Sequence, residues 1–154
     1  MSTKPLKRVP QLQSLSRDHH HGLLLSWKIR KGFSMNINPK RIKDYVDWFW
    51  ISQLKDHFIL EETYVFPLLG NNHPLIKKAL SEHNKIQNLI EDSSDIITSL
   101  YALEEVLEAH IRFEERILFQ EIQKTTTPEM YHESLLKHDQ NLDCHIWPDE
   151  FWKS

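Results

Sequence analysis

The sequence is poor in glycine and cysteine. Only 3 of its 154 residues are Gly, so it lacks both the Gly-rich loops that cradle phosphates and the frequent tight turns of a small β fold. Its single cysteine, Cys144, excludes an internal disulfide and any zinc or iron–sulfur site built from several thiolates. We therefore expect a helical scaffold in a reducing compartment.

Long apolar runs and an excess of basic charge are also missing. No stretch approaches the roughly 20 apolar residues that a membrane helix needs. Lys4, Lys7 and Arg8 are not followed by an apolar run of signal-peptide length. The net charge of -3 gives no electrostatic reason to expect binding to nucleic acid or to anionic lipid. We expect a cytoplasmic protein with no membrane or nucleic-acid partner, and the sequence identifies no protein partner.

Histidine is in excess, with 10 residues in an otherwise ordinary globular composition. The length fits one domain over residues 1–154. Within it we expect an N-terminal arm at 1–13, a body at about 12–142 and a C-terminal tail at 143–154. Trp147, Phe151 and Trp152 make this tail too aromatic for a free linker, so it should pack on the body.

Apolar residues at helical spacing predict an all-α fold. Four long helices are expected at about 14–32, 39–69, from 74 to the polar cluster 91–95, and 99–124, followed by a short fifth helix from 128 to about 142. Asn38 and Pro39 form a good helix start, because Asn can cap and Pro is favoured at the first helical position. The short connections predict an antiparallel up-down-up-down four-helix bundle, in which cofactor sites lie between facing helices.

Two predicted helices each carry a His and a Glu four residues apart, His57 with Glu61 and His110 with Glu114. Residues at this spacing share a helix face, but about one such pair is expected by chance in this composition. The neighbouring positions are more informative, because they carry apolar side chains: Trp50, Tyr64, Val65, Leu103, Val106, Leu107, Ile117 and Leu118. A buried carboxylate and imidazole are costly unless they pair or bind a metal. The alternative is two ordinary surface ion pairs.

His19 and His83 lie on equally apolar stripes of the first and third helices. Taken alone, His83 also fits a hydrogen-bonded core histidine. In the run His19-His20-His21, successive side chains point about 100° apart, so one normally faces the core; His19 aligns with Leu15, and His20 is the alternative.

Four His and two Glu at comparable depth suit two adjacent metal ions. Imidazole and carboxylate fit iron, manganese or zinc, and one carboxylate can bridge two ions about 3.5–4 Å apart. Six ligands leave an open position for O₂, NO or peroxide.

These residues resemble the hemerythrin-like, HHE cation-binding family. The resemblance covers about residues 12–142 and rests on Asp18-His19, the stretch 57–62 with Phe66-Pro67, Glu82-His83, and His110 with Glu114. It implies two non-haem Fe ions with an oxo or hydroxo bridge, with Mn or Zn as substitutes. The implied terminal ligands are His19, His57, His83 and His110, and the implied bridging carboxylates are Glu61 and Glu114.

The chain differs from the oxygen-carrying hemerythrins at two positions. Those proteins have a second His four residues after the third-helix ligand, where this chain has Gln87, and an Asp five residues after the fourth-helix His, where it has Glu115. One imidazole fewer disfavours reversible O₂ carriage. The pattern is closer to bacterial relatives linked to NO and oxygen sensing or iron-centre repair, and to a eukaryotic iron-sensing domain. A ferritin-like site is less favoured, because its Glu-x-x-His motif occurs once, at Glu129 and His132.

The leading hypothesis is a non-haem diiron protein that binds or senses O₂ or NO. The alternatives are a diiron redox enzyme that reduces NO or peroxide or repairs iron centres, an iron sensor or store, and a metal-free interaction bundle. We expect Glu62, Glu115 and Gln87 around the site or on the surface, Trp50 and Tyr64 in the core or along the open side of the site, and His132, His138 and His145 in surface or tail packing.

Overall fold

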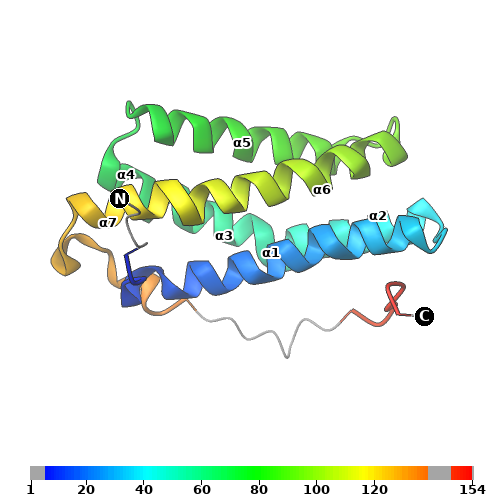
Figure 1. Cartoon of the computed structure of the whole chain (residues 1–154), viewed down its shortest axis with the longest axis horizontal. Coiled ribbons are helices and arrows are strands. Elements are labelled where there is room, and N and C mark those ends of the chain that lie inside the picture. The colour runs from blue at the N-terminus through cyan, green and yellow to red at the C-terminus, as the bar shows by residue number, and fades with distance from the viewer. Residues whose placement is uncertain (1–5, 139–146, 154) are drawn as a thin grey trace, which may run out of the picture.

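The computed structural model describes residues 6–138 and 147–153, which contain helices and no strand. Four long helical stretches lie side by side in Figure 1. The elements are α1 (Pro10–Ser34); α2 (Pro39–Phe49), η1 (Trp50–Leu54), α3 (Lys55–Leu60), η2 (Glu61–Val65) and α4 (Phe66–Leu69); α5 (Pro74–Glu91); and α6 (Ile96–Phe113), η3 (Glu114–Leu118) and α7 (Phe119–Thr125). The all-helical prediction is confirmed.

Side-chain caps fix several of the helix ends. The Asn38 side chain accepts a hydrogen bond of 2.9 Å from the Lys40 amide at the start of α2, as the sequence predicts. Asp95 accepts one of 3.1 Å from the Thr98 amide, and α6 therefore begins a few residues earlier than predicted. α1 also starts earlier, at Pro10, because proline is tolerated in the first turn of a helix.

Three π-helical turns, η1, η2 and η3, interrupt the long stretches. A π turn holds more residues than an α turn, so the residues after it are rotated relative to the α-helical count. This rotation explains one wrong expectation: Ile117 is 50% exposed, whereas Phe119 is fully buried. Two of these turns begin at Glu61 and Glu114, which are the two candidate bridging carboxylates.

Two hydrophobic clusters fill the two ends of the body. The first is built around residues such as Leu25, Ile29, Ile42, Leu103 and Phe151. The second includes Leu12, Leu15, Phe66, Ile76 and Phe119. Each candidate His lies along its helix where one cluster gives way to the other. The polar interruption predicted at mid-helix is therefore a buried polar layer between two apolar ends.

The predicted fifth α-helix is wrong over residues 128–138. The chain forms two short 3₁₀ turns there, Pro128–Met130 and Glu133–Leu135, with extended backbone between them. The His132 ring accepts a hydrogen bond of 3.0 Å from the Ser134 amide, so it starts a new turn where a helix would have continued. This path buries Tyr131 and Leu135 against the second cluster. The rest of the predicted helix, and Cys144, lie outside the described residues.

The C-terminal residues 147–153 pack on the opposite end of the body, as predicted for the aromatic tail. Phe151 is 2% exposed and belongs to the first cluster, with its ring centroid 5.8 Å from that of Tyr45. Trp147 and Trp152 are partly buried against the same cluster. No helix of the described residues is long and apolar enough to cross a membrane.

Replacing Phe151 with Ala should lower the free energy of unfolding by about 3–4 kcal/mol, because a fully packed aromatic ring would leave a cavity. Urea unfolding followed by circular dichroism measures this change. The control is Trp27→Ala, at a position that is 44% exposed, which should cost less than about 1 kcal/mol. Equal losses in the two variants would contradict the packing of the tail.

Candidate metal centre

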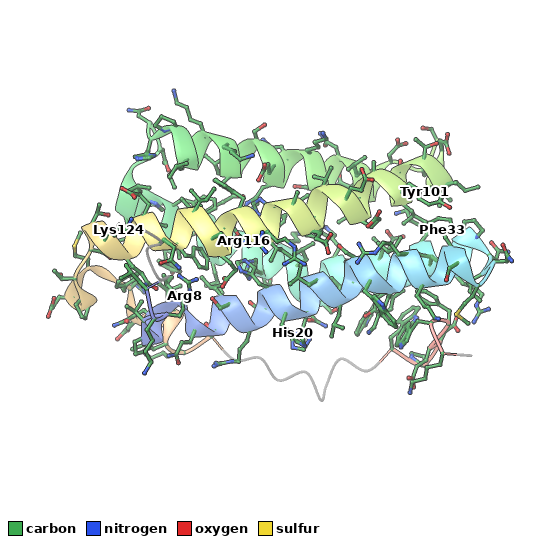
Figure 2. The ribbon with its side chains drawn as sticks, viewed as in Figure 1. Arg8, His20, Phe33, Tyr101, Arg116 and Lys124 are labelled. Carbon is green, nitrogen blue, oxygen red and sulfur yellow. The ribbon has the colours of Figure 1, made fainter. Side chains whose placement is uncertain are left out.

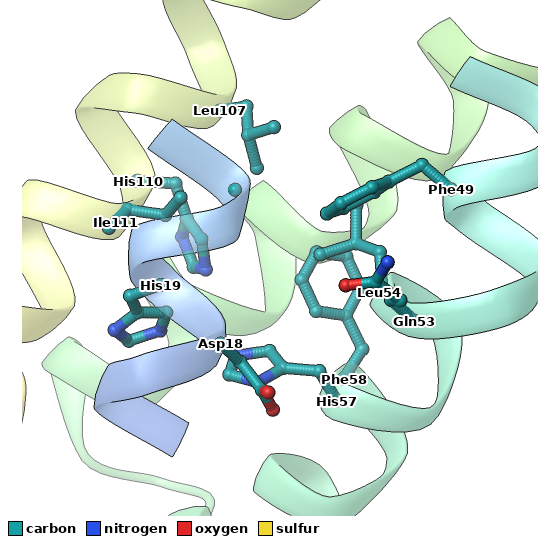
Figure 3. A pocket seen from close by; sticks show the side chains of 11 residues that line it. Asp18, His19, Phe49, Gln53, Leu54, His57, Phe58, Leu107, His110 and Ile111 are labelled. Carbon is teal, nitrogen blue, oxygen red and sulfur yellow. The ribbon is translucent and has the colours of Figure 1, made fainter. Parts of the chain in front are cut away.

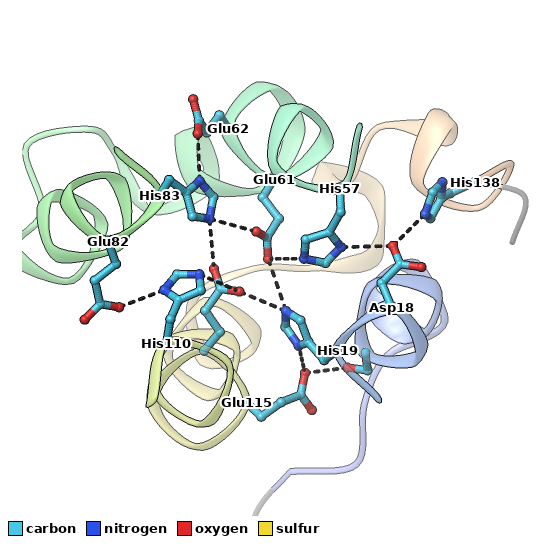
Figure 4. A network of polar contacts seen from close by, with 12 residues as sticks. Asp18, His19, His57, Glu61, Glu62, Glu82, His83, His110, Glu115 and His138 are labelled. Carbon is cyan, nitrogen blue, oxygen red and sulfur yellow. Dashed lines mark hydrogen bonds and ion pairs between the residues drawn. The ribbon is translucent and has the colours of Figure 1, made fainter. Parts of the chain in front are cut away.

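The structure brings all six predicted ligands to one point between the helices (Figure 4). Each is at most 3% exposed. They are His19 on α1, His57 on α3, Glu61 on η2, His83 on α5, His110 on α6 and Glu114 on η3. Of the two candidates on the first helix, His19 is buried among the other inner residues, whereas His20 is exposed and projects away from the other helices (Figure 2).

The six residues form two groups that share both carboxylates. One group is His19, His57, Glu61 and Glu114, and the other is Glu61, His83, His110 and Glu114. Within each group one potential ligand atom per residue lies within 4.8 Å of all the others. Each group therefore offers two imidazoles and two carboxylates, and the two carboxylates belong to both groups.

The distances between inward-facing atoms fit this arrangement. His57 Nε2 is 3.3 Å from Glu61 Oε2, and His83 Nε2 is 3.1 Å from Glu61 Oε1. Glu114 Oε1 is 3.4 Å from His110 Nε2 and 2.9 Å from His19 Nε2. Atoms bound at about 2.0–2.2 Å to one ion lie roughly 3 Å apart, so small movements would convert these contacts into coordination bonds.

Several of these atoms have no hydrogen bond of acceptable geometry despite their short contacts. They are Glu61 Oε1 and Oε2, Glu114 Oε2, His83 Nε2 and His110 Nε2. Buried polar atoms without partners are rare in folded proteins, and each costs free energy. Bound cations would satisfy all five atoms, so the residues present fit a metal centre.

The outward nitrogen of every candidate imidazole meets a further carboxylate. The Nδ1 atoms of His19, His57, His83 and His110 lie 2.6 to 2.9 Å from Glu115, Asp18, Glu62 and Glu82, respectively. Ionised carboxylates only accept hydrogen bonds, so each Nδ1 donates, and each Nε2 is directed inward. Such partners fix the orientation of a metal-binding imidazole and raise its basicity.

These four outer contacts run from each helix to the next. Asp18 of α1 holds His57, Glu62 of η2 holds His83, Glu82 of α5 holds His110, and Glu115 of η3 holds His19, as the dashed lines of Figure 4 show. Each outer carboxylate is the sequence neighbour of an inner residue on its own helix. The ring of contacts therefore closes around the body.

The match to known families agrees with this geometry. The family model described as the Hemerythrin HHE cation binding domain matches residues 11–122. The chain belongs to this family. The match spans all six inner residues and ends before the two 3₁₀ turns and the C-terminal segment. No curated protein and no solved structure matches the chain.

Membership in the HHE family implies that the chain binds cations, iron among them, and the two buried His and Glu groups can hold a metal. The 3₁₀ segment of Glu129 and His132 takes no part in this centre. Both residues are exposed, so the ferritin-like alternative has no site in the described chain.

Sequence reasoning missed part of the outer ring. Asp18 and Glu82 were noticed only as neighbours of His19 and His83, yet each contacts an imidazole on another helix. Glu62 and Glu115 were expected around the site or on the surface, and both contact an inner imidazole. The available signal was an acidic residue beside each inner residue, but its partner depends on how the helices pack.

The expectations for the remaining residues have mixed outcomes. Trp50 is buried in the first hydrophobic cluster and Tyr64 packs, partly buried, against the second, so a core position is confirmed for both. Trp50 packs on Phe58, and Tyr64 stacks on His132 with ring centroids 4.2 Å apart. Neither lines the small cavity beside the centre. Gln87 donates to Glu91. His138 is not a simple surface residue, since its Nε2 lies 2.7 Å from Asp18.

A small cavity of about 10 Å³ lies beside the centre, enough for one water-sized molecule. Figure 3 shows His19 and His110 on one side of it and Phe49 and Gln53 on the other. Its remaining walls are mostly apolar, with Leu54, Phe58, Leu107 and Ile111 among them.

Protons compete with a metal for the inward nitrogens. Although burial lowers the pKa of His57, the charge of Glu61 and the hydrogen bond with Asp18 raise it to about 9. His110 is likewise opposed by burial, but Glu114 and Glu82 raise its pKa to about 9. Although burial raises the pKa of Glu61, the imidazoles around it hold that pKa well below its usual range. Metal binding should therefore release protons.

Replacing Asp18 with Ala should weaken metal binding by about 10–100-fold, because His57 loses the acceptor that orients it. A competition titration against a chromophoric chelator measures the affinity. The control is Asp56→Ala, an exposed acid next to His57 in the sequence, whose affinity should stay within about twofold. Unchanged affinity in Asp18→Ala would show that the outer ring has no role in binding.

Metal removal should also make the stability of the HHE domain depend on pH. The raised pKa values of His57 and His110 contribute stability that is fully present below about 6.5 and is lost as the pH passes about 9. The free energy of unfolding of chelator-treated protein should fall by at least about 2 kcal/mol between pH 6 and pH 10. Chemical denaturation across this range tests the prediction, and a flat profile would contradict it.

Proposed function

We propose that this HHE domain holds a carboxylate-bridged pair of non-haem iron ions within an antiparallel up-down-up-down bundle and binds or senses O₂ or NO there. The observation that carries the proposal is that two ligand groups share Glu61 and Glu114 beside a small cavity. Bound iron would supply the point of attachment for a diatomic ligand.

The residues around the cavity support a binding role. The cavity is lined by imidazoles of both ligand groups: His19 and His57 belong to one group, and His110 belongs to the other. A molecule inside the cavity would therefore be adjacent to both proposed ion positions. The apolar walls favour an uncharged guest and exclude bulk water. The outer carboxylates hold the imidazole rings in place, which keeps the position open without rearrangement of the ligands.

A redox enzyme is the second candidate, and one feature favours it. His138, Asp18 and His57 form a chain of hydrogen bonds of 2.7 and 2.9 Å, from a partly exposed imidazole to an inner one. Reduction of NO or peroxide consumes protons, and such a chain could hold a proton near the centre. Steady turnover with a reductant would favour the enzyme, whereas a stable adduct without turnover would favour the binding or sensing role.

Iron analysis tests the centre itself. Protein from iron-supplied cells should contain about two irons per chain and show an oxo-bridge absorption band that dithionite removes. His57→Ala and Glu114→Ala should each lose at least one iron, whereas His20→Ala, an exposed neighbour of His19, should keep both. Less than one iron per chain in the unaltered protein would refute the diiron proposal, and equal losses in all three variants would refute the ligand assignment.

A further inference from the structure

A second, larger cavity lies next to the one beside the metal centre. It has a volume of about 280 Å³, and its walls include Tyr45 and Trp48 of α2 together with Trp147 and Trp152 of the C-terminal segment. We call the two the inner and the outer cavity. Phe49 and Gln53 line both of them, so these two side chains form the partition between the outer cavity and the metal centre.

We propose that small uncharged ligands reach the metal centre from the outer cavity by passing Gln53, and that Gln53 controls the rate of this passage. The proposal rests on the proposed function, because it concerns the ligand of that same centre. It adds an entry route and the residue that sets its rate.

The two halves of the partition differ in freedom of movement. Phe49 is 3% exposed and belongs to the first hydrophobic cluster, where close packing fixes its ring. Gln53 is only partly buried, and its side-chain amide forms no hydrogen bond with the described residues. Unbonded side chains of this kind change rotamer within nanoseconds. Gln53 is therefore the movable half of the partition.

The chemistry of the two cavities selects the ligand. Lys28 lies at the outer cavity, where its Nζ donates to the Tyr45 hydroxyl at 2.9 Å and is 3.9 Å from the ring centroid of Trp152. Apart from Gln53, Asp18 and the three imidazoles, the walls of the inner cavity are apolar, and a charged guest would lose hydration there. An uncharged diatomic molecule passes both environments at the lowest cost.

The C-terminal segment gives this route its outer wall. The HHE match ends at residue 122, whereas Trp147 and Trp152 come from the segment that packs against α2. The outer cavity is thus built partly by residues beyond the matched domain. The proposed route therefore leads from a cavity formed partly by the C-terminal segment to a metal centre formed by the HHE domain.

Stopped-flow mixing of NO with the iron-loaded, dithionite-reduced full chain tests the route. Gln53→Trp should slow NO association by at least about tenfold, because the larger ring fills the passage, while Gln53→Ala should accelerate it about two- to fivefold. The matched control is Gln87→Trp, which lies on α5 and lines neither cavity, and its rate should match that of the unaltered protein. Iron content and thermal unfolding of each variant establish that the centre and the fold are intact.

The outcomes separate this inference from the proposed function. If the unaltered protein holds two irons but binds neither NO nor O₂, the proposed function fails. If it binds NO and both Gln53 variants associate at the unaltered rate, the entry route is overturned and the function stands. Slower association in Gln87→Trp than in Gln53→Trp would also overturn the route.

A second measurement needs no iron chemistry. In the zinc-loaded full chain, dissolved O₂ is paramagnetic and should broaden the methyl NMR signals of Leu54, Leu107 and Ile111, which line the inner cavity. The signals of Leu12 and Ile122, which are fully buried in the second cluster, serve as the comparison. Equal broadening in the two sets would show that the inner cavity does not take up a diatomic gas and would overturn the inference.

Discussion

The fold depends on how the charges of two buried carboxylates are stabilised. Glu61 and Glu114 are fully buried, and an isolated charge in that position would cost several kcal/mol. The four imidazoles offset part of this cost, but the outer ring adds four more carboxylates. Two of these outer carboxylates, Glu115 and Glu82, also pair with Arg8 and Lys78. Both oxygens of Glu61 and one oxygen of Glu114 nevertheless keep no hydrogen bond. Bound cations are the natural completion of such a layer, and the apolar clusters on either side keep it dry.

The backbone itself adapts to these two residues. The π turn η2 begins at Glu61, and the π turn η3 begins at Glu114. The remaining π turn, η1, ends at Leu54, before the first inner residue of its stretch. Single π turns inside α-helices occur frequently at functional sites. Here each turn lets a Glu face the interior while the helix beyond it regains apolar contact through residues such as Val65 and Phe119. The helix is thus irregular at the two residues where metal coordination would offset the loss of regular α-helical hydrogen bonding.

The sequence predicted the parts of the structure that depend on local pattern. Helical spacing identified the four long stretches, and the apolar neighbours of His57 and His110 identified the buried layer, because burial leaves a periodic trace. The π turns leave no such trace, so Ile117 was assigned to the buried face although it is half exposed. The contacts of Asp18 and Glu82 were missed because these residues meet His57 and His110 through packing between helices. The fifth helix failed because the His132 cap and the burial of Tyr131 outweigh local helix preference.

The closed ring of outer contacts makes the centre a property of the whole body. No three of the four stretches can orient all four imidazoles, because each stretch both supports a neighbour and is supported by another. A shift of one helix by a single turn would break two of these contacts at once. Cation affinity in this chain is therefore a measure of the mutual register of its helices, and a partly assembled intermediate would bind cations poorly.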